Sequence, residues 1–228
     1  MEPAGGGVAS VEDGTWPRKV LIDLVPLAKS VPAILGSPSP TATRILETAL
    51  DCFYGKGYEA TSLQDIADIV GILKGSLYHY IESKQDLLAA VFVTQYERQR
   101  TTVTILNGED NAGVDAIRSF VVAFAKCNLI DVRTTSIMDR DWRSLSEVDR
   151  VSVVGQTQRY LDYLREVITV AQSRGEISPA QSPGLAATGI MGMLTWAHSW
   201  YRPGSRLAPD AVGLAYANLV VAGLQERP

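Results

Sequence analysis

The chain has 228 residues, of which 46% are hydrophobic and 20% are charged. These values exclude a wholly disordered chain, a collagen and a protein with many membrane spans, and the length suits one or two globular domains. Lys and Arg number 21 against 25 Asp and Glu, so the formal net charge is −4 and any site for nucleic acid must be a local one.

Cysteine usage and the start of the chain indicate the compartment. Cys52 and Cys127 both stand in apolar helical patterns, where a free thiol behaves as a small hydrophobe, and two cysteines cannot form a disulfide framework. The first residues are acids and glycines, where a secretory signal has basic residues and an apolar block. The first apolar stretch, residues 20–28, is short and contains Asp23 and Pro26. We therefore expect a cytoplasmic protein that is neither exported nor inserted in a membrane.

Residues 1–40 hold six of the 11 prolines and a run of glycines. Because proline fixes its own φ and disfavours the helical region for the residue before it, we expect a flexible N-terminal arm. Two interpretations of this arm stay open. It is either a disordered leader, which the acidic residues nearby favour, or an arm that enters the minor groove of DNA with Arg18, Lys19 and Lys29.

Helical periodicity begins at Thr41. Apolar residues recur at i, i+3, i+4 and i+7 in the first predicted helix, and the two glycines that follow it can end a helix in a left-handed conformation. The stripe consists of Leu46, Ala49, Leu50 and Phe53, and the glycines are Gly55 and Gly57. This pattern predicts one amphipathic helix ahead of a tight connection.

Two shorter helices are predicted next. Thr61 and Gln64 have the spacing of a capping box, in which a hydroxyl and an amide satisfy the free backbone N–H groups at a helix start. The second helix ends at Gly71, where a sharp turn is needed, and in the third helix Leu77 and Ile81 point inward. Three helices with one tight turn within about 40 residues outline a helix-turn-helix head.

The rest of the chain is helical in pattern, with no alternation long enough to indicate a strand. Helices are predicted over residues 84–106, 114–130 and 146–174, with a short segment around Trp142. The last two helices begin at Pro183 and Pro209. Ser146 marks the start of the long helix and Gly175 its end. The sequence therefore predicts an all-α fold of about nine helices.

The stretch TATRILETALDCFYGKGYEATSLQDIADIVGILKGSLYHYIESKQDLLAAVF, residues 41–92, resembles the DNA-binding head of the TetR family of bacterial repressors. The resemblance rests on the first helical stripe, the GYEATS junction and the run KGSLYHY with SKQDLL. It implies a helix-turn-helix head at residues 41–88, after an arm of residues 1–40, and an effector-binding and dimerisation domain at residues 89–228. The implied function is a ligand-responsive transcriptional regulator, most often a repressor, that binds a double-stranded DNA operator.

A recognition helix must bury one side in its own domain and offer short polar and planar groups to a major groove about 12 Å wide. With Leu77 and Ile81 inside, the candidates for DNA contact on the third helix are Lys74, Gly75, Ser76, Tyr78 and His79. Gln64 suits a base edge, while Thr61 and Ser62 suit a phosphate at a helix start. Tyr80 and Lys84 follow from the resemblance, which places Lys84 at the family's phosphate-binding lysine. Taken singly, each lysine fits equally a solvated surface position.

One residue of the head departs from the pattern that it resembles. Leu73 stands where the family commonly has a Ser or Thr that caps the third helix, so this cap is absent. Residues 41–90 also carry four basic residues against seven acidic ones. We therefore expect few neutralised phosphates and a modest salt dependence, because each phosphate contact contributes about −0.9 to the log–log slope.

Site selection in a genome requires a second recognition helix at a fixed distance, which a symmetric dimer supplies. The last two predicted helices are apolar on most sides, so they must be buried all round. In the resembled family these helices pair between two subunits as a four-helix bundle. We therefore expect a homodimer.

The resemblance also implies a small-molecule pocket in the C-terminal domain. The strings DRDWRSLS and MGMLTWAHSWYRPGSRLAPD resemble a subgroup that senses acyl-CoA thioesters, which makes this class one candidate effector. Such a ligand needs an apolar channel for its tail and arginines for its phosphates. The candidate effector-binding residues are Trp142, Arg143, Arg159, Tyr163, Trp196 and Trp200. Packing of Trp196 and Trp200 in the core or in a dimer interface is an equally open interpretation.

Two other classes of function explain less of the sequence. One alternative is an all-helical enzyme or ligand carrier. The sequence contains no G-x-S-x-G motif, no phosphate-binding glycine loop and no His–Cys pairing, and its two histidines, His79 and His198, stand on separate predicted elements. We therefore expect no enzyme, no cofactor and no metal. An adaptor that has lost DNA binding is the other alternative, motivated by Leu73 and the acidic head.

Overall fold

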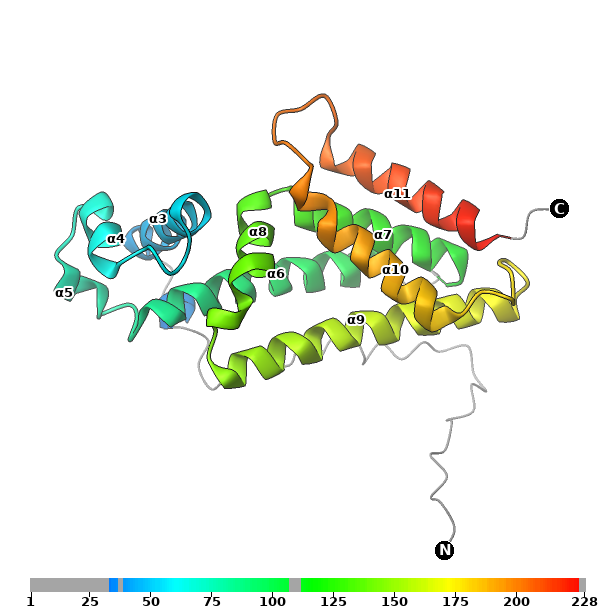
Figure 1. The fold of residues 1–228 in the computed structure, drawn as a ribbon, viewed down its shortest axis with the longest axis horizontal. Coiled ribbons are helices and arrows are strands. Elements are labelled where there is room, and N and C mark those ends of the chain that lie inside the picture. Colours follow the sequence, from blue (N-terminus) through cyan, green and yellow to red (C-terminus); the bar gives the residue numbers. More distant parts are fainter. Residues whose placement is uncertain (1–32, 37–38, 107–111, 226–228) are drawn as a thin grey trace, which may run out of the picture.

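Residues 33–36, 39–106 and 112–225 are described by a computed structural model of the protein. They form ten α-helices and two short 3₁₀ helices, with no β-strand among them (Figure 1). The helices are α2 (Ala33–Gly36), α3 (Pro40–Lys56), α4 (Leu63–Val70), α5 (Lys74–Leu77), α6 (Lys84–Leu106), α7 (Val114–Leu129), α8 (Val132–Asp141), η1 (Trp142–Ser144), α9 (Glu147–Ser173), α10 (Pro183–Trp196), η2 (Ala197–Ser199) and α11 (Pro209–Leu224). The prediction of an all-α fold is confirmed, with one α-helix more than expected.

The helix-turn-helix head consists of α3, α4 and α5. Ser39 is the N-cap of α3, and its side chain accepts a hydrogen bond from the backbone N–H of Ala42. Gly57, with φ 93°, is the C-cap. Helix α4 ends at Gly71, whose φ of 74° lies in the left-handed region that favours glycine and turns the chain sharply into α5. The predicted stop at Gly71 is therefore confirmed. Of the two glycines predicted to end the first helix, Gly57 ends it, with a ψ of 153° that is not left-handed helical, whereas Gly55 lies within α3.

The predicted capping box of α4 is wrong by one residue. Ser62 is the N-cap: its hydroxyl accepts from the Asp65 backbone N–H at 3.1 Å, and the Asp65 carboxylate accepts from the Ser62 backbone N–H at 2.8 Å. Thr61 is only 1% exposed and donates its hydroxyl to the Gly57 carbonyl oxygen at 2.8 Å. Both pairs have the spacing of a capping box, and the burial of Thr61 decides between them.

Part of the predicted flexible arm is helical. Residues 33–36 form α2, and Ile34 is buried in the core of the head. The expectation of a flexible arm up to residue 40 is wrong here, because an apolar run between Pro32 and Pro38 leaves room for one helical turn that buries Ile34. The three basic residues proposed for a minor groove, Arg18, Lys19 and Lys29, lie outside the described residues.

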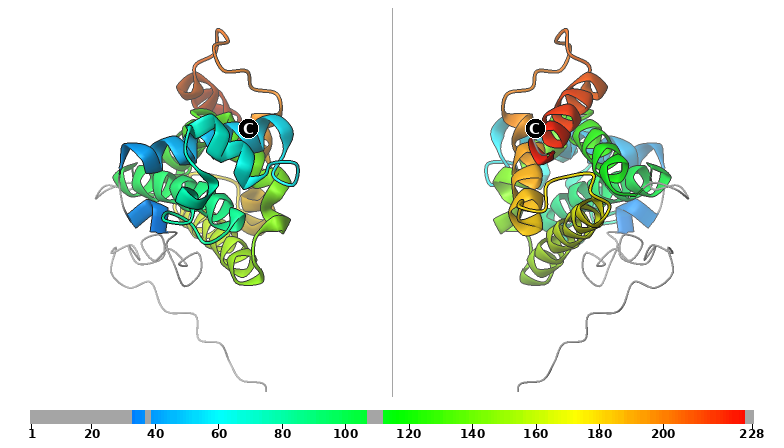
Figure 2. Two further views of the ribbon diagram at one scale, coloured as in Figure 1. Left: turned by 90° about the vertical axis from the view of Figure 1, so that its left-hand side faces the viewer. Right: turned by 90° about the vertical axis from the view of Figure 1, so that its right-hand side faces the viewer.

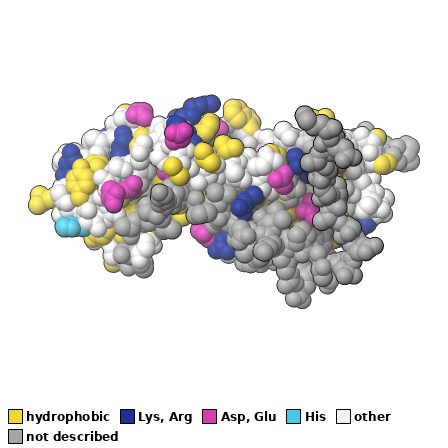
Figure 3. Space-filling model, turned by 90° about the horizontal axis from the view of Figure 1, so that it is seen from below, with side chains coloured by type: hydrophobic (Ala, Val, Ile, Leu, Met, Phe, Trp, Pro, Cys, Tyr) yellow, Lys and Arg dark blue, Asp and Glu magenta, His cyan; other side chains and the backbone are white. Residues whose placement is uncertain are grey.

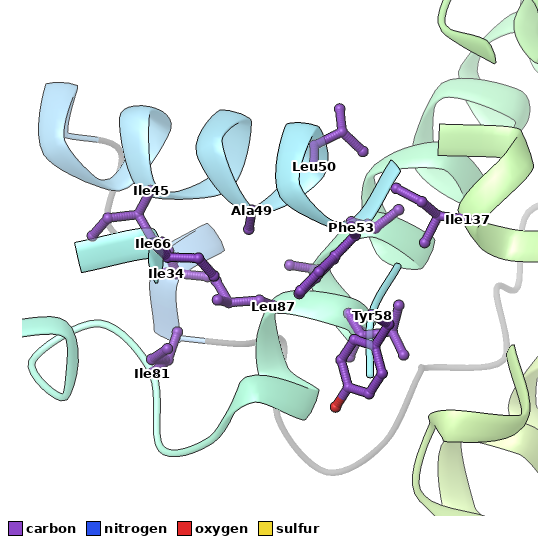
Figure 4. Close-up of a cluster of buried hydrophobic side chains, with 14 of the residues drawn as sticks. Ile34, Ile45, Ala49, Leu50, Phe53, Tyr58, Ile66, Ile81, Leu87 and Ile137 are labelled. Atoms are coloured by element: carbon purple, nitrogen blue, oxygen red, sulfur yellow. The ribbon is translucent and has the colours of Figure 1, made fainter. Parts of the chain in front are cut away.

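The head shares its hydrophobic core with the C-terminal part of the molecule. Phe53 of α3, Leu87 of α6 and Ile137 of α8 belong to one buried cluster, together with Ile34 of α2 (Figure 4). The boundary expected at residue 88 therefore lies within a continuous core rather than between two separate ones.

Polar bonds fasten α8 to α3 beside this core. The guanidinium of Arg133 donates to the carboxylates of Glu47 and Asp51 on α3, and that of Arg140 donates to the carbonyl oxygen of Phe53. The ion pairs of Arg133 lie at the surface, where each one stabilises a protein by at most about 1 kcal/mol. Their main effect is to orient α8 against the head.

Helix α7 lies at the centre of the C-terminal part and contacts α6, α8, α9, α10 and α11. Figure 2 shows these helices from the two ends of the molecule. The predicted helix boundaries are confirmed here: the Ser146 hydroxyl caps α9, Gly175 follows its end with φ 69°, and Pro183 and Pro209 open α10 and α11.

A buried polar network links four helices of this part. The side-chain oxygen of Asn128 accepts hydrogen bonds from the amides of Gln95 and Gln99, at 3.2 and 3.0 Å, and its amide donates to the Leu194 carbonyl oxygen at 3.2 Å. Tyr160 donates its hydroxyl to Gln99 at 3.0 Å. Because buried polar groups must be paired, the network specifies how α6, α7, α9 and α10 align.

Helices α7 and α11 pack with their backbones close together at Gly213. A Cβ atom at this position would lie 2.9 Å from the carbonyl oxygen of Val122 and 3.0 Å from its Cα. Only glycine fits without moving one helix away from the other.

No helix in residues 33–36, 39–106 and 112–225 is long and apolar enough to cross a membrane. Both cysteines are free, and burial raises the pKa of the Cys127 and Cys52 thiols. Raised thiol pKa values reduce the thiolate fraction, so both side chains act as small hydrophobic groups.

Candidate functional site

The outer end of the head presents a segment of residues 74–80, the recognition segment. Its inner residue Leu77 is buried, as is Ile81 just beyond it, so the predicted inward pair is confirmed. Helix α5 is a single turn. It continues as hydrogen-bonded turns, in which the backbone N–H groups of His79 and Tyr80 donate to the carbonyl oxygens three residues earlier. Exposed side chains or backbone are found at Lys74, Gly75, Tyr78 and His79, while Ser76 and Tyr80 are partly buried. Seen from below, hydrophobic side chains lie beside scattered basic ones at this end, without a continuous basic surface (Figure 3).

The start of α4 presents fewer side chains for DNA contact than predicted. Ser62 and Gln64 are not buried, but the Gln64 amide donates one hydrogen bond to the Asp68 carboxylate at 2.7 Å, which leaves its second N–H and its carbonyl oxygen for a base. The hydroxyl of Thr61 is buried, so the predicted phosphate contact of Thr61 requires correction: a hydroxyl contact at this helix start falls to Ser62.

Acid should weaken the cap of α4. The hydrogen bond from Lys56 at 2.6 Å, together with the bonds from Ser62, lowers the pKa of Asp65 to about 2. Because this folded-state value lies below the ordinary aspartate pKa of about 3.9, the cap contributes stability above that value and loses it as the pH falls toward 2. We expect the difference in melting temperature between the wild type and Asp65→Ala to shrink between about pH 4 and pH 2. Thermal unfolding followed by circular dichroism across this range checks it, and a constant difference would contradict it.

Helix α5 begins without a side-chain cap, as predicted. Leu73 occupies the N-cap position, is 80% exposed and makes no capping hydrogen bond. We expect Leu73→Ser to raise the stability of the head by about 0.5–1 kcal/mol, because a hydroxyl can accept from a free N–H group of the first turn. Hydrogen exchange of the α5 amides measures the effect. Leu73→Ala, which removes the apolar side chain without adding a cap, is the control, and equal protection in the two variants would disprove the capping argument.

Lys84 is partly exposed, and its ammonium is bonded to the protein. Its ammonium donates to the carbonyl oxygens of Tyr58 at 2.9 Å, Glu59 at 3.4 Å and Thr61 at 3.0 Å. The phosphate contact that the resemblance implies for Lys84 would compete with these bonds.

A cavity of about 410 Å³ lies among α6, α7, α8, α9 and α10. Its walls are mostly apolar, and Gln99, Asn128 and Tyr160 of the polar network also line it. The apolar lining includes Phe92, Tyr96, Phe124, Met138, Trp142, Val153 and Met191. Asp139 is the one charged residue among the described residues that line it. A volume of this size is typical of small-molecule sites.

A second, more open hollow adjoins this cavity and shares Trp142 and Val154 with it. Arg143 and Arg150 line the hollow together with Glu147. The Arg143 guanidinium lies over the Trp142 ring, 4.8 Å from its centroid, and Arg150 donates to the Arg143 carbonyl oxygen. Two arginines thus stand outside an apolar chamber.

The predicted effector residues are only partly brought together. Trp142 lines the cavity and Arg143 the adjoining hollow, whereas four predicted residues line neither of these two sites. These are Arg159, Tyr163, Trp196 and Trp200. Tyr163 is buried against Phe120, while Trp196 and Trp200 are exposed.

Sequence reasoning missed the polar lining of the cavity. Gln99 and Asn128 are amide residues at buried helical positions, where the periodicity would be satisfied by apolar ones. This contrast was the available signal, because a polar side chain in a core position needs partners of its own.

Two family models match the chain. The model described as "Bacterial regulatory proteins, tetR family" covers residues 45–91, which include most of the head. The model described as "Tetracyclin repressor-like, C-terminal domain" covers residues 110–224, half of the chain. The chain belongs to the TetR family. Proteins of this family are DNA-binding transcriptional regulators rather than enzymes, so the TetR protein described here is a regulator with a helix-turn-helix head.

Relatives with known names agree in length and fold with this TetR protein. The HTH-type transcriptional repressor KstR2 of Mycolicibacterium smegmatis is 27% identical over 205 residues, which are 83% of this chain and 95% of that protein. The TetR family regulator PfmR from Thermus thermophilus is 29% identical with a TM-score of 0.72, over 80% of this chain and 100% of the other. The structure of AibR in complex with isovaleryl coenzyme A and operator DNA is 26% identical with a TM-score of 0.68, over 80% and 96% of the chains.

The TetR protein leaves apolar side chains uncovered on α10 and α11. Leu185 and Trp196 of α10 and Leu214 and Leu219 of α11 are all more than half exposed. Small residues are exposed beside them, which permits close approach of another surface. Large exposed apolar side chains on two neighbouring elements of the chain make these helix faces a candidate interaction site.

Proposed function

We propose that this TetR protein is a homodimeric, cytoplasmic repressor that leaves a palindromic operator when a small hydrophobic effector binds in the cavity. One observation carries the proposal. Helix α6 begins just after the recognition segment, and Phe92, Tyr96 and Gln99 of the same helix line the cavity. A ligand in the cavity therefore presses on the helix that bears the head.

The DNA side of the proposal rests on exposure. Lys74, Tyr78 and His79 are exposed and suit contacts with base edges or phosphates in a major groove. Gly75 permits close approach of the backbone. Ser62 and Gln64 add contacts from α4, and Ser76 and Tyr80 lie at the rim of this surface.

The dimer side rests on the apolar faces of α10 and α11. An isologous interface pairs the same patch on two subunits, and Trp196 and Leu219 are the large side chains available to anchor it. For Trp196 this is the dimer-interface interpretation that the sequence left open beside an effector contact. A symmetric dimer also sets the distance between two recognition segments.

The effector side rests on the cavity and its adjoining hollow. The cavity accepts an apolar group whose polar atom can meet Gln99, Asn128 or Tyr160, and Arg143 and Arg150 outside it suit an anionic group. An acyl-CoA thioester combines both chemistries. The complex of AibR with isovaleryl coenzyme A supports this class of effector.

A second connection joins the cavity to the head through η1. Ser144, two residues after Trp142, donates its hydroxyl to the Glu59 carboxylate at 2.9 Å and accepts from the Gln85 amide through its carbonyl oxygen at 3.1 Å. An effector that moves Trp142 therefore displaces contacts on both α6 and the connection between α3 and α4. To empty the operator almost completely, it must bind the released form about 10⁴-fold more tightly than the DNA-bound form.

Selection of duplexes from a random library, followed by titration of acyl-CoAs into the protein–DNA complex, tests the proposal. We expect a palindromic site and its release by acyl-CoAs of one range of chain lengths. Arg150→Ala should raise the acyl-CoA concentration needed for release by about tenfold, because it removes a charge-assisted bond. Arg165→Ala, exposed on the same helix outside the hollow, is the matched control. Retention of the complex at every chain length would exclude this effector class, and failure to select any duplex would point to an adaptor.

A further inference from the structure

The ammonium of Lys84 is held by carbonyl groups of the protein itself. It carries three N–H donors, and the three carbonyl oxygens of Tyr58, Glu59 and Thr61 lie 2.9, 3.4 and 3.0 Å from it. The same ammonium lies over the Tyr58 ring, 4.2 Å from its centroid, in a cation–π contact. A phosphate oxygen would have to displace a bond that already exists.

These carbonyl groups belong to residues 57–61, the junction between α3 and α4. The junction turns back on itself: Gly57 has φ 93°, the Thr61 hydroxyl donates to the Gly57 carbonyl oxygen, and the Thr61 N–H donates to the Tyr58 carbonyl oxygen. Ser62, the N-cap of α4, follows directly. The position of the junction therefore determines where α4 begins.

Lys84 is also the first residue of α6. Its bonds reach carbonyl groups 23 to 26 residues earlier in the sequence and so join the start of α6 to the junction that leads into α4. Because the turn at Gly71 connects α4 directly to α5, a fixed start of α4 also fixes the recognition segment.

We propose that Lys84 is a positioning residue for operator binding, which orders the junction and α4 and neutralises no phosphate. The proposal rests on the DNA-binding function of the family and departs from the phosphate contact that the resemblance implies. Lys74 provides the contrast, since it is exposed at the start of α5 and free to reach DNA.

Salt dependence separates the two roles. A lysine that neutralises a phosphate releases a counterion, and its removal lowers the magnitude of the log–log slope by about 0.9 per copy, or about 1.8 per dimer. We expect this change for Lys74→Met. For Lys84→Met we expect the affinity for the selected duplex to fall about tenfold, the cost of re-ordering about one backbone residue, with the slope changed by less than about 0.5.

The measurement is the dissociation constant of wild type, Lys74→Met and Lys84→Met for one selected duplex, from about 50 to 200 mM salt. Active dimer is counted by stoichiometric titration, so that loss of folded protein does not mimic loss of affinity. Hydrogen exchange of the Thr61 and Ser62 amides should be faster in Lys84→Met and unchanged in Lys74→Met. A merely structural role of Lys84 would lower the amount of active dimer and leave the affinity of that dimer unchanged, which would overturn the proposal.

Lys84→Arg is the second variant, and it decides the question if Lys84→Met does not fold. Arginine binds phosphate well but cannot place a compact ammonium among three carbonyl oxygens. We expect Lys84→Arg to lose affinity. Wild-type or tighter binding by Lys84→Arg, or a slope for Lys84→Met reduced by about 1.8, would overturn the proposal. Absence of any selected duplex for the wild type would instead count against DNA binding itself, so the two failures are distinguishable.

Discussion

Asn128→Leu should lower the free energy of unfolding by about 3 kcal/mol, although the two side chains have the same branched shape. The substitution removes the acceptor of the Gln99 amide and the donor to the Leu194 carbonyl oxygen. The Gln95 amide loses one of its two acceptors and keeps the Cys127 carbonyl oxygen. Unpaired buried groups cost far more than a hydrogen bond gains, because they have given up water without replacement. Urea unfolding of the dimer at fixed protein concentration measures the change.

Two further variants make the Asn128 experiment specific. Gln64→Leu, at an exposed position of α4 away from the cavity and from α10 and α11, should change the free energy of unfolding by less than about 0.5 kcal/mol. Gln99→Leu should lower the free energy of unfolding less in the Asn128→Leu background than in the wild type. In that background it removes an amide donor that has already lost its acceptor. Additive effects of the two leucines would show that the network has no cooperative role.

Gly213→Ala should lower the free energy of unfolding by about 2 kcal/mol and should also weaken dimerisation. The new methyl group would meet the backbone of Val122 at 2.9–3.0 Å, and a backbone atom moves only with its whole helix. Helix α11 must therefore shift away from α7, which alters the apolar face that carries Leu214 and Leu219. Urea unfolding and sedimentation of the variant measure the two effects.

Gly55→Ala is the control for Gly213→Ala. Gly55 also lies in a helix, but a Cβ atom there would meet nothing within 4 Å. Alanine has the higher helix propensity, so this variant should be more stable than the wild type by up to about 1 kcal/mol. A Gly213→Ala protein as stable and as dimeric as the wild type would show that α11 adapts freely.

Features that depend on neighbouring residues were predictable from the sequence. Leu77 and Ile81 were assigned inward by their spacing, and the caps at Ser146 and Gly71 by residue type, because a helix's periodicity and its ends are local properties. The missing cap at Leu73 was visible for the same reason.

Features that depend on how distant helices face one another could not be predicted from the sequence. Trp196 and Tyr163 are aromatic residues in the helices around the cavity, yet one points outward and the other into the α7–α9 core. The capping box failed because two adjacent hydroxyl residues fit the same spacing, and only tertiary burial of Thr61 distinguishes them. For Lys84, the motif indicated the correct position in the chain but not its carbonyl partners, 23 to 26 residues away.

The shared cluster of Phe53, Leu87 and Ile137 has a consequence for protein engineering. A chimera that grafts residues 41–88 onto the body of another regulator would sever this cluster and expose its apolar walls to water. An exchange that also carries α8 and the first turns of α6 keeps the contacts intact. Met138 of α8 and Phe92 of α6 also line the cavity, so such a transplant carries part of the cavity wall along with the head. The DNA-binding head and the cavity therefore cannot be exchanged independently of each other.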